Sequence, residues 1–277
     1  MATPTVIAHR GYAGVAPENT LEAAAVAADD DRTSMLEIDV QPAACGTPVV
    51  IHDERLEGTR DGRPLTDGSG HVWETPLEEL RETHVLGTDA TVPTLEAFLE
   101  SIPETMGVNV ELKNPGTTDV RFAEALPADE REERREVWTP FVDRVVDACE
   151  AFGGEILFSS FCEGALAALR DVAPRYPAAT LVWHDLEAGL EITRRYDCEA
   201  IHPPRNVILG TGLEQTTYAG FSGEAIPGID VLEEAHREGR TVNVWTVTTW
   251  NQFEALAAAG VDGIIADYPG LGSFSDA

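Results

Sequence analysis

The stretch 5-TVIAHRGYAGVAPENT-20 decides how the rest of the chain is read. A short apolar run ends abruptly at His9-Arg10-Gly11, and order resumes at Thr20, ahead of an alanine-rich run. This pattern predicts a buried strand, a loop and a helix capped by Thr20. An imidazole and a guanidinium at the end of such a strand lie on the rim of a sheet, where α/β proteins carry their chemistry.

Apolar runs rich in β-branched residues recur along the chain and alternate with helical patterns. The predicted strands are 5–9, 35–41, 48–52, 107–113, 155–160, 178–182, 199–202, 241–247 and 262–266, and the predicted helices are 20–30, 94–102, 139–151, 163–171, 187–195, 230–238 and 250–259. Too few residues separate 35–41 from 48–52 for a parallel crossover, so 48–52 is expected to return antiparallel. The other eight strands predict a TIM-type (β/α)8 barrel of the α/β class.

We expect residues 1–277 to form one domain, because barrels of about 250 residues commonly fold as a unit. Residues 54–93 interrupt the alternation with a Gly/Asp/Pro-rich run and a short helix near 76–83. A long segment without regular structure is usually functional, so we predict a small inserted subdomain covering the barrel mouth. The charged run 129–135 is predicted to be a solvated helix start.

The composition is strongly acidic, with 49 Asp and Glu against 19 Lys and Arg and a formal net charge of −30. This excess disfavours nucleic acid and anionic membranes as partners. Lys113 is the only lysine, and acid-rich, lysine-poor chains are typical of a halophilic, salt-loaded cytoplasm. The first strand starts without an export segment and no apolar run has membrane-spanning length, so we expect a cytoplasmic protein without stable membrane association. The four scattered cysteines are expected to be buried thiols.

Acidic side chains alternate in two of the predicted strands. Glu37 and Asp39 share one face of LEIDV, and Glu111 and Lys113 share one face of VNVELK. Crowded carboxylates repel one another unless a cation joins them, and all-oxygen ligation suits Mg²⁺ or Ca²⁺. The sequence therefore predicts one divalent cation held by Glu37, Asp39 and Glu111.

Formal charges then indicate an anionic substrate. The divalent ion, Arg10 and Lys113 together carry one positive charge more than the negative charge of the three carboxylates. This net charge of +1 matches the single negative charge of a phosphodiester. His9 and His52 each end an apolar run. A pKa near 6.5 suits two imidazoles to deprotonating a nucleophile and protonating a leaving oxygen. For His202 the sequence leaves two roles open: it could line the mouth of the barrel, or it could be structural.

Taken together, these residues resemble the glycerophosphodiester phosphodiesterases. The motifs are HRG at 9–11, PENT at 17–20, LEIDV at 36–40, VVIHD at 49–53, PTLEAF at 93–98, VELK at 110–113, VWTV at 244–247 and GVDGIIADYP at 260–269, in the family's order. The resemblance implies an enzyme that uses a divalent metal to release sn-glycerol 3-phosphate and an alcohol from a small glycerophosphodiester.

The resemblance also implies roles for individual residues. The matches are His9 and His52 to the acid/base pair, Glu37, Asp39 and Glu111 to the metal ligands, and Arg10 and Lys113 to phosphate-binding positions. Trp245 matches an aromatic at the mouth, with a core tryptophan as the competing interpretation. Glu18 and Asn19 match residues that hold the first loop, with a plain capping role as the alternative. Asp267 and Pro269 are expected to be structural.

For the mechanism, we expect the substrate's glycerol 2-hydroxyl to attack phosphorus and give a cyclic phosphate that water opens, because an adjacent hydroxyl has a large effective concentration. Direct attack by water is the alternative.

A lysophospholipase D-type enzyme would need an apolar surface at the mouth of the barrel, which the polar segment 54–93 does not offer. A non-catalytic glycerophosphodiester-binding protein would not need two histidines, and neither would a metal-dependent sugar isomerase or aldolase barrel.

Overall fold

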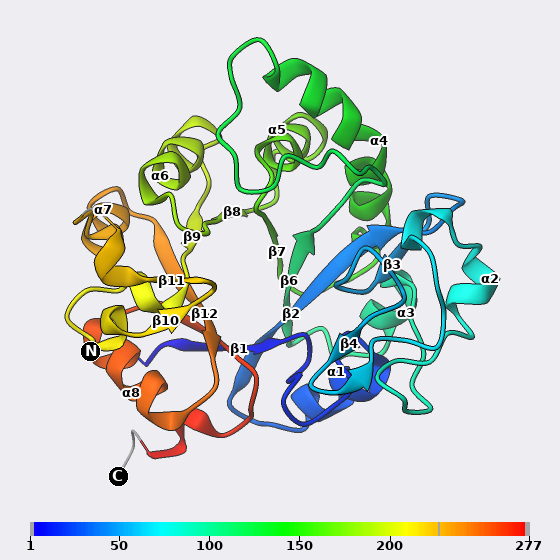
Figure 1. Cartoon of the computed structure of the whole chain (residues 1–277), viewed down its shortest axis with the longest axis horizontal. Helices are drawn as coiled ribbons and strands as arrows, with labels where there is room; N and C mark the ends of the chain where they lie inside the picture. The colour runs from blue at the N-terminus through cyan, green and yellow to red at the C-terminus, as the bar shows by residue number, and fades with distance from the viewer. Residues whose placement is uncertain (1–2, 227, 275–277) are drawn as a thin grey trace.

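The computed structural model describes residues 3–226 and 228–274, and within them eight parallel strands form a closed barrel surrounded by helices (Figure 1). The order is β1-β13-β12-β9-β8-β7-β6-β2, and β1 also pairs with β2, which closes the ring. The strands are β1 (Thr5–His9), β2 (Thr33–Pro42), β6 (Gly107–Leu112), β7 (Ile156–Ser160), β8 (Ala178–Leu181), β9 (Ala200–His202), β12 (Thr241–Val247) and β13 (Gly263–Ala266). The predicted TIM-type barrel is confirmed.

Strand β3 (Pro48–Val50) lies outside the ring and runs antiparallel to β2, with Val40 opposite Val50. The turn between them closes where the Ala43 N–H donates to the Thr47 carbonyl over 2.9 Å. This is the antiparallel return predicted from the short connection. It brings the residues that follow β3 back beside the carboxyl end of β2.

Seven helices lie around the barrel. They are α1 (Leu21–Ala28), α3 (Leu95–Glu100), α4 (Arg131–Cys149), α5 (Glu163–Val172), α6 (Leu186–Arg195), α7 (Val231–Arg237) and α8 (Trp250–Ala259). Thr20 and Thr94 cap α1 and α3, and their hydroxyls accept from the backbone N–H three residues onward. No helix in the described ranges combines the length and the apolar content needed to cross a membrane.

Helix α4 differs from its predicted range. It begins at Arg131 rather than at 139, so the charged run and the later helical pattern form one helix with Pro140 inside it. The Thr139-Pro140 pair looks like a helix start because proline favours the first turn. Inside a helix proline leaves a carbonyl one turn earlier without its usual donor. The Thr139 hydroxyl donates to the Arg135 carbonyl over 2.7 Å, one residue before the carbonyl that lacks its donor.

Three segments that follow strand ends border the mouth of the barrel. Residues 54–93 contain β4 (Thr59–Arg60), β5 (Arg63–Pro64), η1 (Val72–Glu74) and α2 (Leu77–Leu80) around a small apolar cluster of their own. Residues 113–130 form a long loop between β6 and α4. Residues 203–226 contain η2 (Arg205–Val207), η3 (Leu213–Gln215), β10 (Thr217–Tyr218), β11 (Phe221–Ser222) and η4 (Gly223–Ala225). A last short helix, η5 (Leu271–Phe274), follows β13. Only the first of the three segments was anticipated.

Three of the four cysteines, Cys149, Cys162 and Cys198, are buried free thiols, as expected. Cys45 is exposed, in contrast to the expectation. It lies in the turn between β2 and β3, where no element covers it.

Candidate active site

The predicted site residues come from the carboxyl ends of neighbouring strands. His9 ends β1 and lies opposite Glu37 of β2, and Asp39 lies opposite Glu111 of β6. Because side chains alternate along a strand, Glu37 and Asp39 point to the same side of β2, into the barrel. His52 follows β3, where the Ile51 N–H donates to the Asp39 carbonyl over 2.9 Å. Parallel register thus brings together residues far apart in the sequence.

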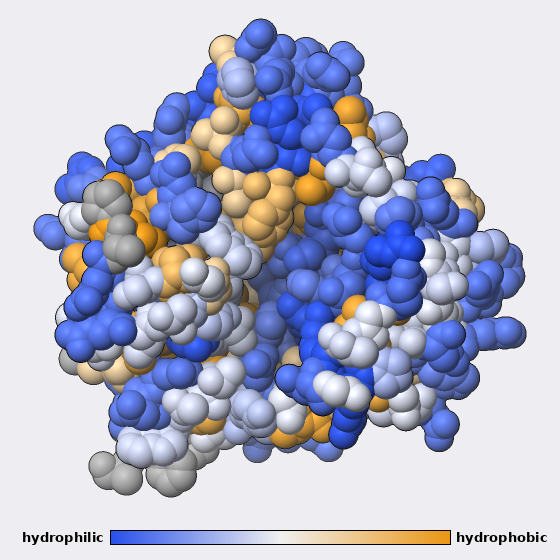
Figure 2. Space-filling model, viewed as in Figure 1, coloured by the Kyte–Doolittle hydropathy of each residue, from blue (hydrophilic) through white to orange (hydrophobic). Residues whose placement is uncertain are grey.

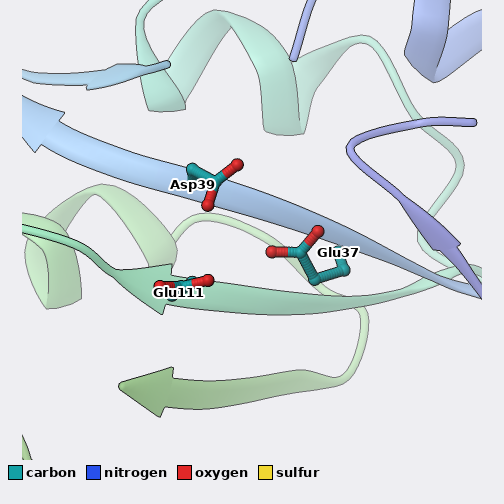
Figure 3. A group of neighbouring side chains, drawn as sticks. All are labelled: Glu37, Asp39 and Glu111. Carbon is teal, nitrogen blue, oxygen red and sulfur yellow. The ribbon is translucent and has the colours of Figure 1, made fainter. Parts of the chain in front are cut away.

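The carboxylates of Glu37, Asp39 and Glu111 converge at the inner face of β2 and β6 (Figure 3). One oxygen from each lies within 4.8 Å of the other two, and all three residues are buried. Such a group of hard oxygen donors fits a divalent cation of the Mg²⁺ or Ca²⁺ class.

Two cations flank these carboxylates. Arg10 Nε lies 3.2 Å from Asp39 Oδ2, and Lys113 Nζ lies 2.9 Å from Glu111 Oε1 and 3.5 Å from Asp39 Oδ1. Burial acts to raise the pKa of Asp39, but His52, Arg10 and Lys113 outweigh it and lower that pKa. Asp39 is therefore the carboxylate that stays charged most readily.

The other two carboxyl groups behave differently. Burial, with repulsion from Asp39 and Glu111, raises the pKa of Glu37 well above its usual range. Burial also raises the pKa of Glu111 to about 7, despite the opposing effect of Lys113. When two neighbouring carboxyl groups both have raised pKa values, the site contains too little positive charge to stabilise both as carboxylates.

His52 is held by neighbours that follow it along the chain. Its Nδ1 lies 3.4 Å from Asp53 Oδ1 and 3.4 Å from Nη2 of Arg60. Arg60, on β4, donates to Asp53 Oδ2 over 2.7 Å and pairs with Glu18. Burial and the cations Arg10 and Lys113 lower the pKa of His52 to about 4, so it is neutral at pH 7. Sequence reasoning missed Arg60, because a single arginine in a polar segment carries no signal of its own.

His9 is held by Asp267, which follows β13. Nδ1 of His9 lies 2.6 Å from Asp267 Oδ1, and Nε2 lies 3.8 Å from Glu37 Oε2. A carboxylate can only accept here, so Nδ1 carries the proton and Nε2 faces the carboxylate group. Asp267 is expected from the sequence to be structural, and its contact with His9 also places it at the candidate site.

Glu18 and Asn19 support the loop after β1. Asn19 donates through Nδ2 to Asp39 Oδ2 over 2.8 Å, and its Oδ1 accepts from the Asp39 backbone N–H over 3.2 Å. Glu18 accepts from Arg10 over 3.1 Å. Asn19 and Arg10 have left-handed backbone conformations, with φ of 60° and 50°, and the loop therefore stores strain at the site.

A cavity of about 510 Å³ at the mouth of the barrel is lined by His9, Arg10, Glu37, His52, Glu111 and Lys113. Trp245 lines it, half-buried, with Nε1 donating to the His202 carbonyl over 2.8 Å. His202 itself is fully buried, and its Nε2 lies 2.9 Å from Asn243 Nδ2. Of the two roles considered for His202, this placement fits the structural one. Figure 2 shows a hollow at the centre of this face, with hydrophobic atoms along its upper side and hydrophilic atoms to the right.

The hydrophobic side of the cavity was not foreseen. We define the aromatic wall as Phe122, Phe161, Trp183, Tyr218 and Trp245, all of which line the cavity. An apolar surface at the mouth therefore exists, but loops after β6, β7, β8 and β9 and strand β12 build it, not the segment 54–93. The argument against lipid-like substrates from the polarity of 54–93 is thus wrong.

Residues 9–271 match the glycerophosphoryl diester phosphodiesterase family. Glycerophosphodiester phosphodiesterases of Bacillus altitudinis and Caldanaerobacter subterraneus are 27% and 28% identical, each over 95% of this chain and 94% of theirs. A solved structure of an Oleispira antarctica phosphodiesterase in complex with the product sn-glycerol-3-phosphate is 26% identical, with a TM-score of 0.74 over 99% of this chain and 98% of that one.

Proposed function

The chain belongs to the glycerophosphoryl diester phosphodiesterase family, and we propose that it hydrolyses glycerophosphodiesters to sn-glycerol 3-phosphate and an alcohol. The observation that carries this proposal is the cavity at the barrel mouth, where two imidazoles, three carboxylates and two cations meet. The likeness to a phosphodiesterase solved with sn-glycerol-3-phosphate supports the same product.

Glu37, Asp39 and Glu111 would hold one Mg²⁺ or Ca²⁺. Their buried oxygens lie within 4.8 Å of one another. The raised pKa values of Glu37 and Glu111 indicate that the site has too little positive charge to keep all three groups ionised. When bound, such an ion polarises a phosphoryl oxygen and offsets charge that develops in the transition state.

Arg10 and Lys113 would bind the phosphodiester. Both side chains line the cavity, and both remain cationic, because the surrounding carboxylates raise their pKa values in spite of burial. Arginine and lysine are suited to phosphate oxygens as charge-assisted donors. Trp245 would pack on the substrate from the opposite side of the cavity.

His52 and His9 would move protons. His52 is neutral at pH 7, so it can take the proton of the glycerol 2-hydroxyl as that oxygen attacks phosphorus. His9, oriented by Asp267, would enter this step as the imidazolium, with a proton on each ring nitrogen, and give its Nε2 proton to the departing alcohol oxygen. A cyclic phosphate results, and His9 keeps the Nδ1 proton that faces Asp267. In the second step water opens the ring and the two histidines exchange roles. Direct attack by water is the competing route.

The test is the release of sn-glycerol 3-phosphate from glycerophosphocholine, glycerophosphoethanolamine and glycerophosphoglycerol, with and without a chelator. The assay is run in molar KCl, since the charge of −30 suits a salt-loaded cytoplasm. We expect turnover that the chelator abolishes. A substrate lacking the 2-hydroxyl should not react by the cyclic route, and its normal turnover would favour direct water attack.

A lysophospholipase D-type activity is the second candidate, because the aromatic wall offers the apolar surface such a substrate needs. Turnover of 1-acyl-glycerophosphocholine at a higher kcat/KM than glycerophosphocholine would favour it.

A further inference from the structure

The cavity has two unlike sides, and the proposed chemistry uses only one of them. His9, His52 and the carboxylates come from β1, β2, β6 and the residue pair after β3, whereas the aromatic wall comes from the loops after β6 to β9 and from β12. Figure 2 shows hydrophobic and hydrophilic atoms on different sides of the hollow. Apart from Trp245, the proposed hydrolysis of small glycerophosphodiesters gives the aromatic wall no task. An apolar surface left open in a chain this acidic points to a ligand group that covers it.

The aromatic wall is a continuous track from the inside of the barrel to its rim. Ring centroids of Trp245 and Phe161 are 5.7 Å apart, and those of Phe161 and Phe122 are 4.6 Å apart. A parallel path through Trp183 has spacings of 5.9 and 5.5 Å. Phe161 is 9% exposed and Phe122 is 42% exposed, so the track opens to solvent at Phe122.

The loop that carries Phe122 is fixed in place. Arg121 and Ala123, on either side of it, both have a φ of 54°, a strained conformation for residues other than glycine. The Ala123 N–H donates to the Phe161 carbonyl over 3.2 Å. Further along, the Leu126 N–H donates over 2.6 Å to the buried carboxylate of Glu163. These bonds hold the Phe122 ring over the rim, where folding alone gains little from it.

Two rings of the wall already face cations. The Arg205 guanidinium lies 3.5 Å from the centroid of the Tyr218 ring, and Lys113 Nζ lies 6.0 Å from that of Phe161. None of the carboxylates in the described residues forms an ion pair with Arg205, whose guanidinium instead donates to the Thr246 carbonyl. Lys113 is already paired with Glu111 and Asp39, so a further cation on this wall would meet the uncompensated positive charge of Arg205, and a neutral group is favoured.

The two halves of the substrate then divide between the two sides. Glycerol carries two free hydroxyls that need hydrogen-bond partners, and an aromatic face leaves them unsatisfied. The hydrophilic side supplies such partners. The alcohol on the other side of phosphorus is left facing the aromatic wall.

On the basis of the proposed function, we propose that the aromatic wall is the subsite for the leaving alcohol and selects a neutral, apolar alcohol over a charged one. The contact area comes from Trp245, Phe161, Trp183 and Phe122. Arg205 sets the preference against a cationic head group.

Three diesters that share the glycerol 3-phosphate half test this assignment. Their alcohols are methanol, choline and 3,3-dimethylbutanol, which is the neutral carbon isostere of choline. We expect kcat/KM for the dimethylbutyl ester to exceed that for the methyl ester about 30-fold, taking about 0.8 kcal/mol per buried methylene and half burial of five added carbons. The dimethylbutyl ester should also have a KM about fivefold below that of the choline ester. KM is compared there because the two alcohols differ in intrinsic reactivity.

Two variants at Phe122 separate apolar contact from cation–π contact. Phe122→Ser should lower the ratio of the dimethylbutyl to the methyl kcat/KM about fivefold, and Phe122→Leu, which keeps apolar area without a ring, should keep it within about twofold. A lower KM for the choline ester, with Phe122→Leu as damaging as Phe122→Ser, would overturn the proposal in favour of an ammonium-binding box. Equal kcat/KM for all three esters would overturn it outright. Release of sn-glycerol 3-phosphate from none of them would instead refute the proposed function.

Discussion

Asp267 Oδ1 lies 2.6 Å from His9 Nδ1, although 258 positions separate the two residues along the chain. Strand β13 pairs in parallel with β1, with Ala266 opposite Ala8, and this pairing places the two side chains next to each other. A carboxylate that accepts from Nδ1 fixes both the tautomer and the ring orientation of an imidazole. Closure of the barrel thus sets the direction in which His9 presents Nε2.

We expect Asp267→Asn to lower kcat about 10²- to 10⁴-fold, because a neutral amide does not stabilise the His9 imidazolium. The amide can also donate to Nδ1, which leaves Nε2 protonated when it must act as the base of the second step. KM for glycerophosphocholine should change little, since Asp267 does not hold the phosphate. Steady-state release of sn-glycerol 3-phosphate measures both. The matched control is Asp262→Asn, which changes a similar contact with His236, an exposed residue, at 2.8 Å and should leave kcat unaltered. Wild-type kcat in Asp267→Asn would remove this residue from the mechanism.

Lys113→Met should raise KM about 10- to 100-fold without weakening metal binding. The ammonium group is proposed to bind phosphate, and its removal also takes a positive neighbour from Glu111 and Asp39, which strengthens their attraction for a cation. Kinetics and calorimetric titration with Mg²⁺ separate the two effects. Lys113→Arg keeps the charge and should recover part of the lost affinity. Weaker metal binding at unchanged KM would contradict the phosphate-binding role.

The pH profile should reflect the lowered pKa of His52, about 4, which burial and two nearby cations produce. His52 is protonated only below that pH, so the base is available through pH 5 to 8. With saturating metal, we expect the acidic limb of kcat/KM to fall near pH 4 to 5. An acidic limb centred near 6.5, the ordinary pKa of histidine, would show that His52 is not the base of the first step.

Metal uptake should release protons below pH 7. The pKa of Glu111 is about 7 and that of Glu37 is raised, so the metal-free protein holds protons that a cation must displace. Apparent affinity should therefore rise with pH up to about 7 and then level off. Calorimetry at pH 6 and pH 8, in two buffers with different ionisation enthalpies, counts the protons released. Affinity that is independent of pH, with no proton release, is the result that would rule this out.

Much of the fold could be predicted because local spacing decides it. The alternation of strand and helix patterns indicates a parallel sheet, and eight such strands fit a closed barrel. The short link after β2 forces β3 to return antiparallel. The start of α4 could not be predicted, because the pair Thr139-Pro140 fits two positions in a helix. It fits the first turn, and it also fits the interior, where the Thr139 hydroxyl donates to the Arg135 carbonyl.

The candidate site divides in the same way. The three carboxylates stand out because acidic residues that alternate within apolar strands have few explanations. Asp267 does not stand out, because its partner His9 lies 258 positions away along the chain. Arg60 does not stand out either, because a single arginine in a polar segment carries no signal of its own. The aromatic wall is equally hidden, since its rings come from five separate parts of the chain.

The pairing of β1 with β13 has a consequence for biosynthesis. His9 leaves the ribosome among the first residues, whereas its carboxylate partner follows every other strand of the barrel. During translation the nascent barrel carries the acids, the arginine and the lysine long before it carries an oriented proton donor. An oriented His9 is therefore available only after the last strand of the barrel has been synthesised.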